Sequence, residues 1–234
     1  MAKNWRGMVL LLLVGSSFAA NAPETNVLRW AENLPGCTFT ADDDGRYRYG
    51  LWTSDLGVVL TVDSQEMQKS LRRTKPTFAV LLTVHYRGKS SLAIDPSAAT
   101  LEFVKHFHEV RRTLDPQQLA TSFQAETDNF AQRITRDIQK HPEKKASLES
   151  ELEENRQSTT EMLTFLRTRS LHPATLDAGH ASTDGWIYFD PRGKWINEWE
   201  KQEEFVLRIP LGNQILEFPF ALPQSQNDLR LRRR

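Results

Sequence analysis

The sequence predicts an α+β protein in which an antiparallel β-sandwich is interrupted by a long α-helical hairpin. Short β-rich runs separated by turn residues occur both before residue 115 and after residue 172, and closely spaced strands of this kind are typical of a sandwich. Between them, residues 115–172 show the spacing of apolar side chains that a helix produces. The step Asp115-Pro116 marks the change, because Asp is a good N-cap and Pro fits the first helical position.

The first 22 residues have the composition of a secretory signal peptide. Lys3 and Arg6 precede the apolar run Met8–Val14, and small residues follow it up to residue 22. The apolar run is shorter than the roughly twenty residues that cross a bilayer, so we expect residues 1–22 to be cleaved and the mature chain not to span the membrane. The sequence therefore predicts a secreted or periplasmic protein.

The charge balance and the cysteine content limit the partners and the sources of stability. Lysine plus arginine and aspartate plus glutamate both number 30, and removal of residues 1–22 leaves 28 basic against 30 acidic residues. This balance predicts no nucleic-acid partner. Cys37 is the single cysteine, so an exported chain forms no intramolecular disulfide and is stabilised by packing.

Residues 23–75 are expected to form a β-hairpin followed by a short helix. The segments RYRYGLW and VVLTVD are rich in β-forming residues and are joined by TSDLG, which predicts the hairpin. Asp63 or Ser64 is placed to cap a helix that continues through good helix formers to Arg73, ahead of Pro76.

Two separate segments are expected to form the sandwich. The first, residues 76–114, contains a run over residues 77–86 with apolar side chains on both faces, which is typical of a strand in the middle of a packed sheet. The second, residues 173–222, contains ATL, GWIYF and a predicted hairpin of EFVLRIP and QILEFPF. The chain then ends in a polar basic tail, residues 223–234.

The helical hairpin is placed at residues 115–172, as an insertion between these two segments. Its first helix is expected to end near Lys140, because His141-Pro142 interrupts the backbone hydrogen bonding. The apolar stripe of the first helix consists of Leu119, Phe123, Phe130, Ile134 and Ile138. The stripe of the second helix consists of Leu148, Leu152, Met162, Leu163 and Leu166. We expect the two stripes to face each other in an antiparallel pair.

Strand patterns in both parts of the predicted sandwich resemble those of a known group of domains. The later strands carry Thr175-Leu176-x-x-Gly179, then GWIYF at residues 185–189 and FxLRIP at residues 205–210. The earlier strands carry Val84-His85-Tyr86-Arg87-Gly88, followed by Ile94-Asp95-Pro96. These patterns resemble uncharacterised secreted bacterial domains with an immunoglobulin-like sandwich.

This resemblance covers about half of the mature chain. It implies an immunoglobulin-like antiparallel β-sandwich and a binding or envelope-associated role, and it carries over no catalytic residues. The helical residues 115–170 and the missing lipid-attachment cysteine depart from the usual pattern of that group.

The stretch KHFHE, residues 105–109, sets two histidines two residues apart beside a carboxylate. On an extended chain His106 and His108 share one face and could both reach a metal ion, but in a helix they lie about 200° apart. An apolar pattern at helical spacing runs through Phe103, Phe107, Val110 and Leu114. This pattern favours a helix, and a metal site also needs a third and fourth ligand. We therefore expect no metal and no cofactor, and a metal-dependent hydrolase that uses His106 and His108 is the less favoured alternative.

Trp195 and Trp199 are the candidate surface for a ligand or partner. They lie at helical spacing in the charged segment KWINEWEKQEE, so we expect them to form one face of a short helix that caps the sandwich. Exposed tryptophans could instead stack on sugar rings or anchor a protein partner. Because no catalytic constellation is recognised, the sequence predicts a non-enzymatic binding or envelope-associated module whose partner is an envelope protein or a glycan. A carbohydrate-binding module that uses Trp195 and Trp199 is the alternative.

Overall fold

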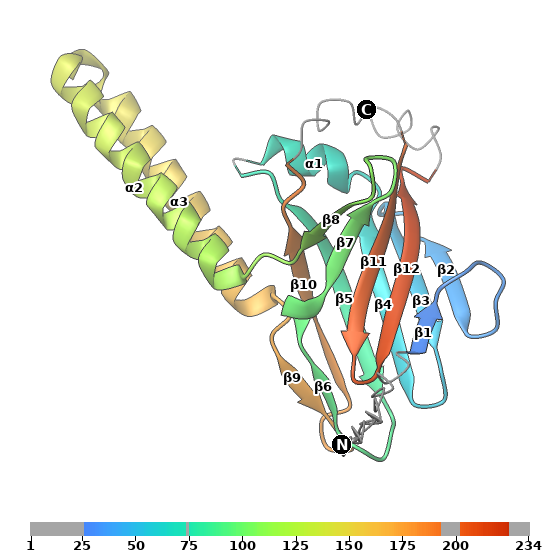
Figure 1. Cartoon of the computed structure of the whole chain (residues 1–234). Coiled ribbons are helices and arrows are strands. Elements are labelled where there is room, and N and C mark those ends of the chain that lie inside the picture. The colour runs from blue at the N-terminus through green and yellow to red at the C-terminus, as the bar shows by residue number, and fades with distance from the viewer. Residues whose placement is uncertain (1–25, 74, 193–201, 225–234) are drawn as a thin grey trace, which may run out of the picture.

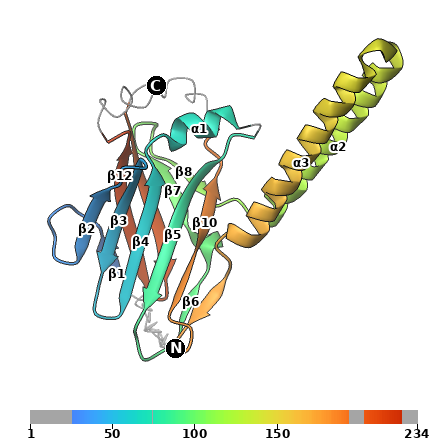
Figure 2. The same cartoon turned by 180° about the vertical axis from the view of Figure 1, so that it is seen from behind.

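Two five-stranded β-sheets pack face to face in the computed structural model, and a long helical hairpin projects from them (Figures 1 and 2). The structure describes residues 26–73, 75–192 and 202–224. Sheet A consists, in order, of β1 (Asn26–Arg29), β12 (Gln214–Leu222), β11 (Glu203–Leu211), β7 (Thr100–Phe103) and β8 (Glu109–Arg112). Sheet B consists, in order, of β10 (Ser182–Phe189), β5 (Phe78–Tyr86), β4 (Leu56–Asp63), β3 (Arg46–Trp52) and β2 (Cys37–Ala41).

Strand pairing in the described sheets is antiparallel, except that β1 runs parallel to β12. A further antiparallel pair joins β6 (Leu92–Ile94) to β9 (Ala174–Leu176). The sequence analysis predicted the hairpin formed by β3 and β4, but it did not place β1 or β2 in the sheets. Both strands are short and mostly exposed, so their residues lack a marked apolar alternation.

The core lies between the two sheets and contains chain from both sides of the helical hairpin. Phe78, Phe103 and Phe205 are fully buried and come from β5, β7 and β11. The ring of Phe205 lies 5.1 Å from that of Phe78, 5.3 Å from that of Phe103 and 5.0 Å from that of Phe220, measured between centroids. Strands before and after the helices therefore share one interior, and the predicted antiparallel sandwich is confirmed.

Helices α2 (Pro116–Lys140) and α3 (Lys145–Arg169) form the predicted hairpin, joined by the short 3-10 helix η2 (Pro142–Lys144). The helix α2 begins as expected, because the Asp115 carboxylate accepts a hydrogen bond of 2.8 Å from the backbone N–H of Gln117. Between the helices, the hydroxyls of Thr127 and Thr159 lie 2.6 Å apart. The base of the hairpin lies beside β10, and its far end points away from both sheets (Figures 1 and 2).

Two short helices complete the described elements: α1 (Glu66–Arg72), which follows β4, and the 3-10 helix η1 (Pro96–Ala98), which follows β6. Within the ranges given above, no helix combines the length and the apolar content that crossing a membrane requires.

The prediction of a helix between Phe103 and Leu114 is wrong. Residues 100–103 and 109–112 are instead the paired strands β7 and β8, in register from Thr100 opposite Arg112 to Phe103 opposite Glu109. The apolar residues on which the helical spacing relied do not share a buried face, since Phe103 is fully buried while Phe107 is fully exposed. Pairing of β7 with the buried strand β11 outweighs the local helical pattern.

Replacement of Phe205 by Ala should destabilise the protein by about 3–5 kcal/mol, because it opens a cavity where three other phenylalanine rings meet. Equilibrium unfolding in urea measures this change. Val27→Ala is the control, since Val27 is half-exposed on β1, and should cost less than about 1 kcal/mol. Equal losses in the two variants would contradict a single core centred on Phe205.

Candidate functional site

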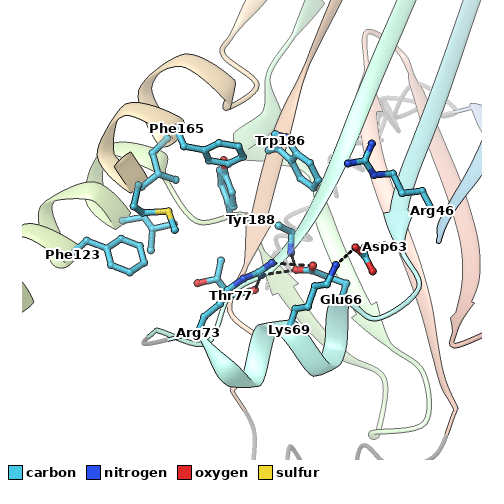
Figure 3. Close-up of a pocket in the computed structure, with 14 residues that line it drawn as sticks. Arg46, Asp63, Glu66, Lys69, Arg73, Thr77, Phe123, Phe165, Trp186 and Tyr188 are labelled. Atoms are coloured by element: carbon cyan, nitrogen blue, oxygen red, sulfur yellow. Dashed lines mark hydrogen bonds and ion pairs between the residues drawn. The ribbon is translucent and has the colours of Figure 1, made fainter. Parts of the chain in front are cut away.

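A cavity of about 330 Å³ lies where α1, the outer face of sheet B and the base of the helical hairpin meet (Figure 3). One wall of the cavity is apolar and the other is charged (Figure 3). The apolar wall consists of Ala79, Leu119, Phe123, Met162, Phe165, Leu166, Trp186 and Tyr188. The polar wall consists of Arg46, Asp63, Glu66, Lys69, Arg73 and Thr77. The cavity thus combines side chains from five separate regions of the chain.

The apolar wall forms because the hairpin base packs on the outer face of β5 and β10. Ala79, Leu119, Leu166 and Tyr188 make a small buried cluster there, separate from the main core. The apolar side chains around this cluster are only partly covered by other side chains. Met162 and Phe165 on α3 are 37% and 39% exposed, although the sequence analysis placed Met162 in the stripe that faces α2. These side chains therefore present apolar surface to solvent at the mouth of the cavity.

Aromatic rings line much of this wall. Phe165 and Trp186 lie with their ring centroids 6.2 Å apart at an interplanar angle of 48°. Tyr188 lies deeper, and its phenol oxygen accepts a hydrogen bond of 3.3 Å from the Ser170 hydroxyl. Burial raises the pKa of Tyr188, so its phenol stays neutral at physiological pH and acts as part of the wall.

A buried ion pair fixes α1 against β5 on the polar side. The Glu66 carboxylate is almost fully buried; Arg73 donates to both of its oxygens, at 2.6 and 3.0 Å, and the Ala79 backbone N–H donates to it at 2.6 Å. Burial raises the pKa of Glu66, and the hydrogen bonds from Arg73 and Ala79 offset part of that rise. Arg73 also donates to the Thr77 carbonyl oxygen.

The two other cations of the polar wall differ in their partners. Lys69 forms an ion pair with Asp63, and Asp63 also accepts a hydrogen bond of 2.8 Å from the Gln65 backbone N–H. The guanidinium of Arg46 lies 3.5 Å from the carboxylate of Asp44, and both side chains are about half-exposed, at 46% and 51%. Figure 3 shows the Arg46 guanidinium directed toward Trp186.

A second hollow, of about 700 Å³, continues from the cavity along the hairpin. It shares Arg73, Phe123 and Met162 with the cavity, so the two form one elongated depression. Further along, it is lined by Phe130 and by polar side chains of α2 and α3.

The histidines of KHFHE lie in the tight turn between β7 and β8. The Glu109 backbone N–H donates to the His106 carbonyl oxygen at 3.1 Å, and Phe107 and His108 between them have φ of 58° and 57°. This is the geometry of a type I′ turn, which usually requires Asn and Gly. His106 Nδ1 lies 2.7 Å from Glu203, and His108 Nδ1 lies 2.5 Å from Glu102.

Each imidazole therefore faces a different carboxylate rather than a shared ligand position. In the described part of the chain, no three or more His, Cys, Asp or Glu side chains are grouped so that they could hold a metal ion. The predicted candidates Trp195 and Trp199 lie outside the described residues.

The carboxylate beside His108 belongs to a row of charges across the outer face of sheet A. Arg208 lies 2.5 Å from Glu102 and 2.7 Å from Glu217, and Arg29 lies 2.9 Å from Glu217. Burial acts to raise the pKa of Glu102, but hydrogen bonds from His108 and Arg208 outweigh it and lower that pKa. The row links β1, β12, β11 and β7 by cross-strand pairs, which indicates a structural role.

No protein-family model, no curated protein and no solved structure matches this chain. The geometry of the cavity is therefore the basis for inferring what it binds. The cavity was not predicted from the sequence, although one signal was present: Phe165 adds an apolar side chain beside the predicted stripe of the second helix, beyond what a two-helix pair needs.

Replacement of Arg73 by Ala should destabilise the protein by about 3–5 kcal/mol near pH 8, because it leaves the buried Glu66 carboxylate without its partner. The loss should shrink as the pH falls toward about 5.5. A buried carboxyl with a raised pKa binds its proton more readily in the folded state, so acid favours folding of this variant. Urea unfolding at both pH values measures the effect. Lys69→Ala, which breaks an exposed pair, should cost less than about 1 kcal/mol at either pH.

Replacement of Phe107 by Gly should make the protein more stable than replacement by Ala, by about 1 kcal/mol. Both variants remove a side chain that is 100% exposed, but only Gly adopts the positive φ of this position without steric cost. Thermal and urea unfolding of the two variants provide the comparison. A less stable Gly variant would contradict the type I′ turn.

Proposed function

We propose that this protein is a secreted or periplasmic, non-enzymatic binding module that holds an apolar ligand group in the cavity between α1, sheet B and the helical hairpin. The observation that carries this proposal is the open aromatic wall, where Phe165 and Met162 remain more than one third exposed beside Trp186. Exposed apolar surface of this kind marks binding sites. The volume of about 330 Å³ falls in the range of small-molecule sites.

The polar wall supports binding rather than chemistry. Its carboxylates are engaged in ion pairs, Glu66 with Arg73 and Asp63 with Lys69, so they act to shape the wall. The sequence of residues 1–22 supports export. The envelope protein or glycan expected from the sequence as a partner stays a separate prediction.

The strand order supports an immunoglobulin-like topology as part of this proposal. In such sandwiches strands A, B and E are neighbours in one sheet and strands C, F and G in the other. Here β4, β5 and β10 are neighbours in sheet B, and β7, β11 and β12 are neighbours in sheet A. On this assignment β8 corresponds to strand C′, and the helical hairpin lies in the connection that leads from strand C′ to strand E.

Two alternative functions that were inferred from the sequence stay predictions. Carbohydrate binding through Trp195 and Trp199 predicts glycan-array binding that Trp199→Ala removes. A hydrolase that uses His106 and His108 predicts stoichiometric zinc by elemental analysis.

The purified protein should bind the uncharged fluorescent probe N-phenyl-1-naphthylamine, with a rise in the emission of the probe. Phe165→Ala should weaken this binding by about tenfold, because it removes most of one side of the apolar wall. Phe107→Ala is the matched control, since it removes the same ring from a fully exposed position that does not line the cavity, and it should leave binding unchanged. Failure of the unaltered protein to bind, or an equal loss in both variants, would overturn the proposal.

A further inference from the structure

We infer that the ligand of this cavity is an amphipathic anion, with its charged group at Arg46 and a single apolar chain along the aromatic wall. This inference rests on the proposed function, because it names the chemical class of the molecule that the cavity binds.

The charge balance of the polar wall favours an anion. The wall holds three cations, Arg46, Lys69 and Arg73, and two carboxylates, Asp63 and Glu66. Both carboxylates are already paired, Asp63 with Lys69 and Glu66 with Arg73. Among the described lining residues, Arg46 is thus the cation whose carboxylate partner, Asp44, lies outside the cavity lining, and a cationic ligand group beside it would be repelled.

Arg46 is the cation that can change partners at the lowest cost. Its carboxylate neighbour Asp44 lies 3.5 Å away, and both side chains are about half-exposed. Surface pairs of this kind contribute about 0–1 kcal/mol. A guanidinium can bind a carboxylate or a phosphate through two parallel hydrogen bonds, so Arg46 can exchange Asp44 for the anionic group of a ligand in the cavity that it lines.

The shape of the depression favours an elongated apolar chain. Figure 3 shows Trp186 and Phe165 between Arg46 and Phe123, and the apolar lining also includes Met162 and Phe123. The last two residues also line the second hollow of about 700 Å³. A chain that begins at Arg46 therefore finds apolar surface over both parts of the depression, whereas a compact ligand would use only the first.

Isothermal titration calorimetry with a series of ten-carbon compounds tests this inference, with each compound kept below the concentration at which it aggregates. Decanoate should bind at least about tenfold more tightly than decan-1-ol, and decyltrimethylammonium should bind more weakly than decan-1-ol. Arg46→Gln should reduce the affinity for decanoate to that for decan-1-ol and leave decan-1-ol unchanged. Decyl phosphate, compared with decanoate, distinguishes a phosphate from a carboxylate headgroup.

Arg48→Gln is the matched control. Arg48 lies two residues further along the same strand, pairs with Asp42 at 2.7 Å and does not line the cavity, so its loss should not change the affinity for decanoate. Arg46→Lys keeps the charge and should retain most of the affinity for decanoate. A loss that is seen with Arg46→Gln but not with Arg46→Lys is therefore due to the missing charge and not to misfolding.

The possible failures are distinguishable. Equal affinity for decanoate and decan-1-ol, tighter binding of decyltrimethylammonium, or an equal effect of Arg46→Gln and Arg48→Gln would overturn the anionic ligand while the proposed apolar site stands. Absence of binding by every compound and by N-phenyl-1-naphthylamine would overturn both proposals.

Discussion

The arrangement of the molecule depends on the aromatic contact between the two sheets. The ring of Phe205 on β11 touches rings from β5, β7 and β12, so one side chain joins strands that come before and after the helical hairpin. This contact closes the interior although more than fifty residues separate β8 from β9 along the chain. With no disulfide available to the single Cys37, the burial of these rings is the main force that holds the sheets together.

The cavity follows from a second, smaller contact on the outside of sheet B. Ala79 and Tyr188 allow Leu119 and Leu166 to pack closely at the base of the hairpin, which buries one region of a sheet face that otherwise meets solvent. The hairpin then leaves the sheet (Figures 1 and 2), and the apolar side chains of Met162 and Phe165 stay more than one third exposed. The helix α1 borders the same region on its polar side. The cavity is thus a consequence of an insertion that is anchored at one end only.

The parts of the fold that the sequence predicted are those with strong local patterns. The strand β5, with apolar side chains on both faces, is an interior strand of sheet B between β10 and β4, and Asp115 with Pro116 defines the start of α2 by capping chemistry alone. The turn at Phe107 and His108 could not be predicted, because its positive φ values suit Asn and Gly and are imposed here by pairing of β7 and β8. The cavity could not be predicted either, because its walls come from segments as far apart in the sequence as Arg46 and Tyr188, and no local pattern indicates that they meet.

The buried pair of Glu66 and Arg73 is best understood through what it positions. Removal of a carboxylate from water costs several kcal/mol, and a buried pair often repays no more than that cost, so stability alone does not account for it. Its three hydrogen bonds fix the start of α1 to Arg73 on one side and to the backbone of β5 at Ala79 on the other. With α1 held in this way, Lys69 reaches Asp63, and among residues 26–73, 75–192 and 202–224 the ion-pair partner of Arg46 is the exposed Asp44. The buried charges thereby set which cation of the wall is available to a ligand.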